Sequence, residues 1–389
     1  MNITKLFKEF FESEKAGGFI LIACALIAIV LSNLPWGVAI QDFLHSHFDL
    51  SFAGLELDHS VEAWVNDGLM TIFFLLIGLE IERELYVGEL SNFRNAILPL
   101  LAAIGGMVFP ALIHYSLNAD TSTASGFGIP MATDIAFALG ILSLAGKNIP
   151  VALKIFLTAF AIIDDLGAIV IIAIFYNNHF ALYWFLASIG IFCLLYIMGR
   201  FRMHALWVYL AGGLIMWYCM MQSGVHATIA GVLLAFAIPF PRTDSVHNPS
   251  YRLQHLLHRP VAFIILPVFA LVNTAIILPA DILSGLGSRN SLGIIVGLIA
   301  GKVSGILIAC FIAVKTGWAL LPKDVTWGLL LGVSILGGIG FTMSIFITNL
   351  AFNDPFLITS SKISILVASC CAGIGGLLIL RNAQNKTIT

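Results

Sequence analysis

Apolar runs separated by short polar turns dominate the chain and predict an all-α bundle of about twelve membrane-spanning helices. A helix of about 20 apolar residues is long enough to cross the hydrocarbon core of a bilayer. Several connections are only a few residues long, so neighbouring helices are expected to be antiparallel. The expected spans cover residues 17–34, 61–85, 96–117, 124–145, 151–176, 182–199, 204–221, 225–239, 256–277, 292–314, 326–351 and 357–381.

A different pattern, alternation with a period of two, occupies the connection between the first two spans. It runs over residues 47–59 and predicts a small external β-hairpin. The alternating apolar residues are Phe48, Leu50 and Phe52 before a turn at Ala53–Gly54, and Leu55 and Leu57 after it. An isolated hairpin is marginally stable in water, so we expect it to pair with a second protomer or to lie on the helix ends.

The composition excludes a soluble domain. Hydrophobic residues make up 59% of the chain and charged residues 10%, whereas soluble domains carry about 25% charged residues. We therefore expect one integral membrane domain over residues 1–389. The six cysteines lie in apolar runs without the spacing of a metal site, which predicts packing roles.

Lysine and arginine fall almost entirely on one side of the expected bundle. By the positive-inside rule this distribution places both termini in the cytoplasm, which agrees with an even number of spans. The residues on that side are Lys5, Lys8, Lys15, Arg83, Arg94, Lys147, Lys154, Arg200, Arg202, Arg242, Arg252, Arg259, Lys315, Lys323, Arg381 and Lys386. The opposite loops carry only Arg289.

Four ionisable residues fall near the predicted middle of the membrane: Asp134, Asp164, Asp165 and Lys302. An ionised carboxylate at this depth costs roughly 2.5–3.5 kcal/mol, and adjacent carboxylates also repel each other. A proton or a metal cation is the simplest compensation, and a hard cation prefers oxygen ligands. The pair Asp164–Asp165 therefore predicts an ion-binding site, with a purely structural ion pair between Asp164 and Lys302 as the alternative.

Two expected spans contain signals that break helices. In the fourth, Pro130 disturbs helical hydrogen bonding before Asp134, and Thr133 offers a hydroxyl. In the eleventh, three glycines and two hydroxyl residues lie between Leu336 and Phe346. Irregular backbone at membrane depth is tolerated only where it is buried in protein or lines a wet cavity. Breaks at corresponding positions of two halves predict a binding site between inverted repeats, here spans 3–5 and 10–12. The alternative is that the glycines serve close helix packing.

The charges suit the ends of broken helices and supply a transport mechanism. Half-helix N-termini carry partial positive and C-termini partial negative charge, so Asp134 could offset one kind of end and Lys302 the other. Burial and mutual repulsion favour protonated carboxyls, so protons and cations compete for the same coupled groups. A site that changes sides only when it is loaded then exchanges one ion for the other.

These residues lie in stretches that resemble the NhaA family of bacterial sodium/proton antiporters, an established example of inverted repeats. The stretches are Thr133–Gly140, Ala161–Ile169, Ser223–Thr228 and Gly338–Ile347, and the resemblance runs from about residue 10 to 381. It implies alternating access and electrogenic export of cytoplasmic Na⁺ or Li⁺ for a larger number of external protons, without a cofactor. It also implies an inner-membrane homodimer held largely by the hairpin, and activation at alkaline pH.

The resemblance assigns roles to the mid-membrane residues. It implies that Asp165 is the central cation ligand and that Asp164 is a proton carrier or the ion-pair partner of Lys302. Asp134 matches the aspartate of the family's unwound fourth span, with Thr133 beside it. Asp165, Asp164 and Thr133 are accordingly the expected ligands of Na⁺.

Candidates for the pH response come from the same resemblance. Glu80, Arg83 and Glu84 match family positions linked to activation at the cytoplasmic funnel, and their spacing puts them on one helix face. A solvated interfacial face would have the same pattern. His226, in the third matching stretch, is a further candidate, with a packing histidine as the alternative.

The chain departs from the family at the start of the ninth span. The family usually has Arg-Leu-Glu-His there, whereas this chain has Gln254 before His255, and Gln254 cannot ionise. The loop before it is also replaced, by Pro241–Asp244. With His255 as the remaining candidate, we expect a shifted or less steep pH profile.

Other functions fit the sequence less well. A retinal photoreceptor also pairs a mid-span lysine with an aspartate, but twelve spans and broken helices argue against it. No aspartate stands in the Gly-x-Gly-Asp context of an intramembrane aspartyl protease, and the His-Glu-x-x-His motif of a metalloprotease is absent. We therefore expect no enzymatic activity. A passive cation channel, which needs no opposing proton flux, is the strongest remaining alternative.

Overall fold

The computed structural model of the chain describes residues 3–51, 57–146, 149–177, 180–201, 203–240, 248–278 and 285–388, with only the backbone for 3–15 and 385–388. Several features discussed above lie outside the described residues. They are the hairpin turn with Phe52 and Leu55, the charged residues Lys147, Arg202 and Arg242, the Pro241–Asp244 loop, and the side chains of Lys5, Lys8, Lys15 and Lys386.

Helices occupy most of the described chain, because apolar segments in lipid must satisfy their backbone hydrogen bonds internally. Each predicted range contains helix. Seven helices among the described residues are long and apolar enough to cross a membrane, or up to ten when each strongly bent pair counts as one span. Two further apolar helices, α9 (Leu206–Gln222) and α10 (Thr228–Ala237), are shorter. The chain is therefore a multi-pass membrane protein, while the count of twelve stays a prediction.

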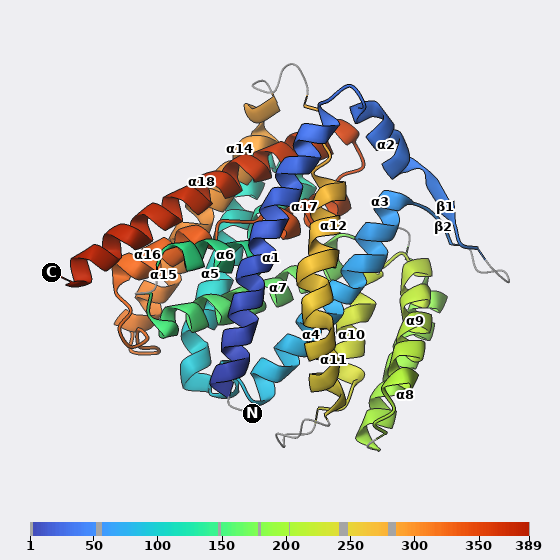
Figure 1. The fold of residues 1–389 in the computed structure, drawn as a ribbon, viewed down its shortest axis with the longest axis horizontal. Helices are drawn as coiled ribbons and strands as arrows, with labels where there is room; N and C mark the ends of the chain where they lie inside the picture. Colours follow the sequence, from blue (N-terminus) through green and yellow to red (C-terminus); the bar gives the residue numbers. More distant parts are fainter. Residues whose placement is uncertain are drawn as a thin grey trace. The chain divides into compact units, whose positions relative to one another are not determined.

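The chain separates into two compact units, each assembled from distant stretches of sequence. Unit 1 combines Met1–Phe19, Glu84–Ile172 and Pro279–Thr389, and unit 2 combines Ile20–Arg83 and Ala173–Leu278. The helices of unit 1 (Figure 1) are η2 (Glu89–Ser91), α5 (Phe93–Asn118), η3 (Ala124–Met131), α6 (Ile135–Leu144), most of α7 (Val151–Phe175), α14 (Arg289–Val296), η5 (Gly297–Gly301), α15 (Lys302–Lys315), α16 (Trp327–Leu336), α17 (Phe341–Ala351) and α18 (Pro355–Ile388).

Unit 2 contains the remaining helices and the β-strands. They are α2 (Gly37–His45), β1 (His47–Asp49), β2 (Asp58–Ser60), α3 (Val61–Ala63), η1 (Trp64–Leu69), most of α4 (Met70–Tyr86), α8 (Leu182–Arg200), α9, α10, α11 (Pro249–Pro260), η4 (Val261–Ile265) and α12 (Leu266–Asn273). Helix α1 (Ile3–Ser32) contributes residues to both units.

Small residues let α5 and α15 approach closely in unit 1. A Cβ atom on Gly105 would overlap the carbonyl oxygen of Gly305, and a Cβ on Gly305 would overlap that of Gly105. In a membrane, where lipid tails are as apolar as leucine, close backbone packing is a main source of helix association. The reciprocal contact holds α15, which begins at Lys302, against α5.

Both predicted interruptions are present in unit 1. The axes of η3 and α6 differ by 41°, and those of α16 and α17 by 44°. The first break follows Pro130 and runs through an extended segment that ends at Asp134. The second break falls on Gly337–Gly340. Glycines also pack closely there, because a Cβ on Gly338 would overlap the carbonyl oxygen of Leu298. These glycines therefore both interrupt the helix and allow close packing, so the two alternatives are compatible.

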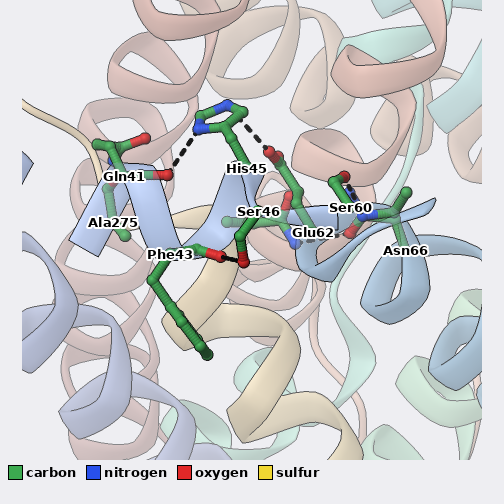
Figure 2. A network of polar contacts seen from close by, with 10 residues as sticks. Gln41, Phe43, His45, Ser46, Ser60, Glu62, Asn66 and Ala275 are labelled. Atoms are coloured by element: carbon green, nitrogen blue, oxygen red, sulfur yellow. Dashed lines mark hydrogen bonds and ion pairs between the residues drawn. The ribbon is translucent and has the colours of Figure 1, made fainter. Parts of the chain in front are cut away.

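The predicted hairpin is confirmed as a two-stranded antiparallel sheet, in which Phe48 is opposite His59. Figure 2 shows the contacts at its base, where α2 ends and α3 begins. The ring of His45 contacts the Gln41 carbonyl oxygen at 2.8 Å and the Glu62 carboxylate at 3.7 Å. The Gln41 amide donates to the carbonyl oxygen of Ala275, just after α12. At the base of the hairpin, these contacts join α2 to α3 and to the segment that follows α12.

Candidate functional site

Asp134 links the two broken spans. As the N-cap of α6, its carboxylate accepts a hydrogen bond from the backbone amide of Phe137 at 2.9 Å. It also accepts from the backbone amide of Thr342 at 3.1 Å and from the Thr342 hydroxyl at 2.5 Å, in the first turn of α17. One carboxylate therefore caps two half-helices, where partial positive charge favours an anion.

The unwound segments also satisfy each other's backbone. The Asp134 amide donates to the carbonyl oxygen of Ile339 at 2.7 Å. The hydroxyl of Thr133 donates to the carbonyl oxygen of Gly337 at 2.8 Å, and the hydroxyl of Ser344 donates to that of Ile129 at 2.6 Å. Buried polar backbone without such partners would be costly. The reciprocal bonds explain how two broken helices remain stable inside the bundle.

Lys302 supplies the positive charge of the site. Its side chain is fully buried at the start of α15, directly after the π-helical turn η5. The ammonium donates to the Asp164 carboxylate at 2.7 Å and to the carbonyl oxygen of Met131, and it lies 5.7 Å from the centre of the Phe160 ring. Met131 is the last residue of η3. Lys302 thus lies at a half-helix C-terminus, and Asp134 lies at two N-termini.

The paired aspartates are both buried on α7, with 0% and 1% of Asp164 and Asp165 exposed. Neighbouring residues on a helix point about 100° apart, so the two carboxylates face different surroundings. Asp164 pairs with Lys302 through Oδ2, whereas its other carboxylate oxygen, Oδ1, has no hydrogen-bond partner among the described residues. Asp165 interacts electrostatically with Lys302. The structure therefore brings the sequence-predicted residues of the ion site together within unit 1.

The oxygen atoms around this pair suit a hard monovalent cation. No three His, Cys, Asp or Glu side chains in the described part of the chain gather as a resident metal site would require. Na⁺ would instead find the carboxylates of Asp164 and Asp165 and the hydroxyl of Thr133, which are oxygen donors. As a transported substrate, Na⁺ must also be able to leave, which favours few protein ligands over a closed cage.

Thr158 is a polar residue of α7 that the sequence pattern did not bring forward. Its hydroxyl is buried, and it has no hydrogen-bond partner among the described residues. Thr158 precedes Asp165 by seven residues, which is almost two full helical turns. The two side chains therefore lie on the same face of α7. This seven-residue spacing is the signal that could have identified it. Lys154, four residues earlier, extends the same polar stripe toward the start of α7.

The pH-response candidates are distant in sequence from the ion-site residues, and they differ from one another in exposure and hydrogen bonding. Glu80 is 3% exposed, whereas Arg83 and Glu84 are half-buried. The Glu84 carboxylate accepts from the backbone amide of Glu89 at 3.1 Å. The ring of His226 contacts the carbonyl oxygen of Tyr176. The hydrogen bonding of His226 fits the packing alternative at least as well as a sensor.

At the start of α11 the substituted position is buried. Gln254 is 6% exposed, and His255 is exposed. One turn earlier on the same helix, Ser250 donates to the carboxylate of Glu82 on α4 at 3.3 Å, and Glu82 is 4% exposed. Glu82 is thus a buried carboxyl beside the helix that lacks one at Gln254, and the sequence alone did not identify it.

A separate buried polar network joins α5, α14 and α18 in unit 1. The Nε2 atom of His114 contacts the amide oxygen of Asn290 at 3.1 Å, and the Asn290 amide group donates to the hydroxyl of Ser361 at 2.8 Å. Asn118 donates to the carbonyl oxygen of His114 at 2.9 Å. Among the described residues, the Nδ1 atom of His114 has no hydrogen-bond partner. These side chains hold together helices on which the ion site depends.

A helical membrane protein in which two broken spans meet around buried carboxylates and a lysine has the architecture of a secondary transporter. The profile of the family described as Na⁺/H⁺ antiporter 1 matches residues 8–380. The chain belongs to this family, the NhaA Na⁺/H⁺ antiporters, as its curated relatives also show.

Two of these relatives are 55% identical to the chain over 388 residues. One is the Na⁺/H⁺ antiporter NhaA of Dechloromonas aromatica, with 99% of this chain and 98% of the relative covered. The other is the NhaA of Flavobacterium psychrophilum, with 100% and 99% covered. The NhaA of Cytophaga hutchinsonii is 53% identical over 391 residues, with 100% and 98% covered. The chain is a Na⁺/H⁺ antiporter, and the prediction that it is not an enzyme is confirmed.

Proposed function

We propose that the chain exports cytoplasmic Na⁺, or Li⁺, in electrogenic exchange for external protons by alternating access. The observation that carries this proposal is the junction where the two unwound segments interlock around Asp134, next to the buried Lys302–Asp164 pair. Burying these charges is costly unless each is paired. A site whose pairing changes with each bound ion is suited to exchange.

The exchange follows from competition for the same oxygen atoms. Asp165 is the central ligand of Na⁺, and Asp164 and Thr133 complete the site. In the proton-loaded state Asp164 pairs with Lys302, as in the contact at 2.7 Å. In the cation-loaded state the charge of Na⁺, in place of the Lys302 ammonium, compensates the carboxylates. The protons bound at the site are then released. Because each loaded state compensates the buried carboxylates and the empty state does not, only loaded sites change sides.

The arrangement of unit 1 supports inverted repeats within a single transporter domain of twelve spans. Spans 3–5 correspond to α5, η3 with α6, and α7, and spans 10–12 to α14 with α15, α16 with α17, and α18. The two bends are of similar size, 41° and 44°. The hydroxyl-to-carbonyl bonds Thr133–Gly337 and Ser344–Ile129 run in opposite directions between the two breaks, and this reciprocal bonding is consistent with a pseudo-twofold relation.

The topology and regulation belong to the same proposal. The lysine and arginine distribution supports cytoplasmic termini in the bacterial inner membrane, with the hairpin external and holding a homodimer. Activation at alkaline pH involves the residues near the start of α11 and the end of α4. They are Glu80, Arg83 and Glu84 on α4 and His255 on α11. His226, just before α10, is a further candidate at a separate place in unit 2, and Gln254 alters the pH profile.

Proton flux in everted membrane vesicles tests the exchange. After an acid-interior gradient is imposed, adding Na⁺ or Li⁺ should release it, and adding K⁺ should not. Vesicles without the protein provide the control. No response to Na⁺ at any pH from about 6 to about 9 would contradict the proposal. A passive cation channel, the second candidate, would carry Na⁺ current without any opposing proton movement.

A further inference from the structure

A cavity of about 730 Å³ lies in unit 1. It is bounded by the start of α5, the start of α7 and residues Gly317–Pro322, which follow α15. Its volume is in the range of small-molecule binding sites. Among the described residues that line it there is none of the mid-membrane charges.

The cavity is lined by polar side chains around the start of α5 and by apolar side chains one turn further along α5 and α7. Glu89, Arg94 and Asn95 are the polar side chains near the start of α5, and Leu98 and Phe156 are among the apolar ones. Helix α5 has 26 residues, so it is about 39 Å long at about 1.5 Å per residue, which exceeds the hydrocarbon thickness of about 30 Å. Its first turn, with Arg94, therefore lies at headgroup level, and Leu98 lies about 6 Å deeper.

The polar end attracts anions. Arg94 is exposed, and no carboxylate among the described residues pairs with its guanidinium group. Among the described residues that line the cavity, the one carboxylate is that of Glu89, and it accepts a hydrogen bond from the Asn95 side chain at 3.1 Å. The N-termini of α5 and α7 also meet here, and each helix end contributes partial positive charge. An anionic group at this end would face Arg94 and two helix dipoles.

Large apolar side chains at the rim of the cavity are exposed, and their contact with water would be unfavourable. Trp318 is 66% exposed and Leu320 is 83% exposed, and both line the cavity. Tryptophan is enriched where proteins meet the headgroup region, because its ring is apolar and its N–H is polar. These residues indicate that the rim lies in the interfacial layer of the bilayer.

We infer that this cavity is a binding site for an anionic phospholipid. The phosphate lies at Arg94 and the two helix starts, and an acyl chain follows Leu98 and Phe156 toward the membrane interior. A soluble anion would leave the apolar half of the cavity unused. A zwitterionic lipid would bring a second cation close to Arg94 together with its phosphate, which weakens the attraction. The inference depends on the membrane location of the chain and does not depend on the ion it transports.

Lipid binding to the purified, delipidated full-length protein tests the inference. Native mass spectrometry with added phosphatidylglycerol or phosphatidylcholine measures the affinity for each lipid. We expect phosphatidylglycerol to bind more tightly, and Arg94→Gln to weaken it about tenfold, the loss of one charge-assisted contact. The matched control is Arg259→Gln, because Arg259 is exposed near the end of α11 and does not line the cavity.

A second variant acts on the apolar half and keeps the charge. Leu98→Trp fills the cavity, so it should weaken both lipids at least severalfold while Arg94 is intact. Equal binding of the two lipids by the unmodified protein, or unchanged phosphatidylglycerol binding by both Arg94→Gln and Leu98→Trp, would overturn the inference. Gel filtration of each variant identifies misfolded protein, and the variant that remains folded decides the test.

Discussion

Replacing Lys302 by methionine should destabilise the protein in a pH-dependent way. Methionine keeps an apolar stem of similar length and removes the ammonium that donates to Asp164 and Met131. Lys302 and Asp164 are both 0% exposed, so the change leaves a buried carboxylate without its partner. Breaking a buried pair in this way costs about 3–5 kcal/mol, whereas an exposed pair contributes only about 0–1 kcal/mol.

The double-mutant cycle isolates the interaction. Lys302→Met with Asp164→Asn removes both charges, and such apolar or neutral replacements of buried pairs are often close to neutral. The double variant should therefore lie within about 1 kcal/mol of the unmodified protein. Because Lys302→Met alone costs about 3–5 kcal/mol, the coupling free energy is at least about 2 kcal/mol in magnitude, and it is larger by whatever Asp164→Asn alone costs. A purely structural pair and a transport pair would both give this coupling, so the cycle tests the geometry alone.

Reversible unfolding by sodium dodecyl sulfate in mixed micelles, at about pH 6 and about pH 9, measures the free energy. In Lys302→Met the isolated Asp164 can take up a proton, and this neutralisation becomes easier as the pH falls. The deficit relative to the unmodified protein should therefore be largest at alkaline pH and smaller in acid. A coupling below about 0.5 kcal/mol, the usual scatter for independent sites, or a deficit that grows in acid, would refute the reasoning.

Four further predictions concern transport and packing. Asp165→Asn should abolish Na⁺-dependent proton flux in everted vesicles, and full-rate exchange would remove its role as the ligand. Thr158→Val, which deletes a buried hydroxyl on the Asp165 face, should raise the half-saturating Na⁺ concentration severalfold, whereas Thr158→Ser should not; equal values for the two variants would argue against a role in cation passage. Gln254→Glu should shift the pH midpoint more than the maximal rate, and an unchanged midpoint would remove the sensor argument. His114→Ala leaves the amide oxygen of Asn290 unpaired and should lower the free energy of unfolding by about 1–3 kcal/mol, while an unchanged stability would show that the buried network contributes little.

The helices of this chain were largely predictable from sequence because lipid removes the alternatives. An apolar segment in a bilayer must bond its own backbone, so run length alone indicates a helix. Local chemistry also predicted the breaks, through Pro130 and through the glycines between Leu336 and Phe346. The hairpin was predictable from a local pattern as well, because side chains alternate along a strand and residues 47–59 show this alternation.

The partners of the charged groups were only partly predictable. A mid-membrane lysine and aspartate invite pairing, but Asp164 and Asp165 are neighbours, and nothing in the run separates their surroundings. The helical geometry of α7 places the Asp164 carboxylate toward Lys302, whose Nζ atom donates to Asp164 Oδ2 at 2.7 Å. No residue pattern indicated that the Met131 carbonyl would share the same ammonium, because a backbone carbonyl has no sequence signature.

By itself, the sequence determined a multi-pass helical protein with two breaks, a hairpin and four mid-membrane charges, because each of these follows from interactions within a single segment. Only the tertiary structure decided that Asp134 caps α6 and α17 together, that Gly105 packs on Gly305, and that Arg94 borders a cavity with Trp318. These contacts join residues about 200 positions apart. Local periodicity carries no information on such distances, and the packing of the helices alone sets them.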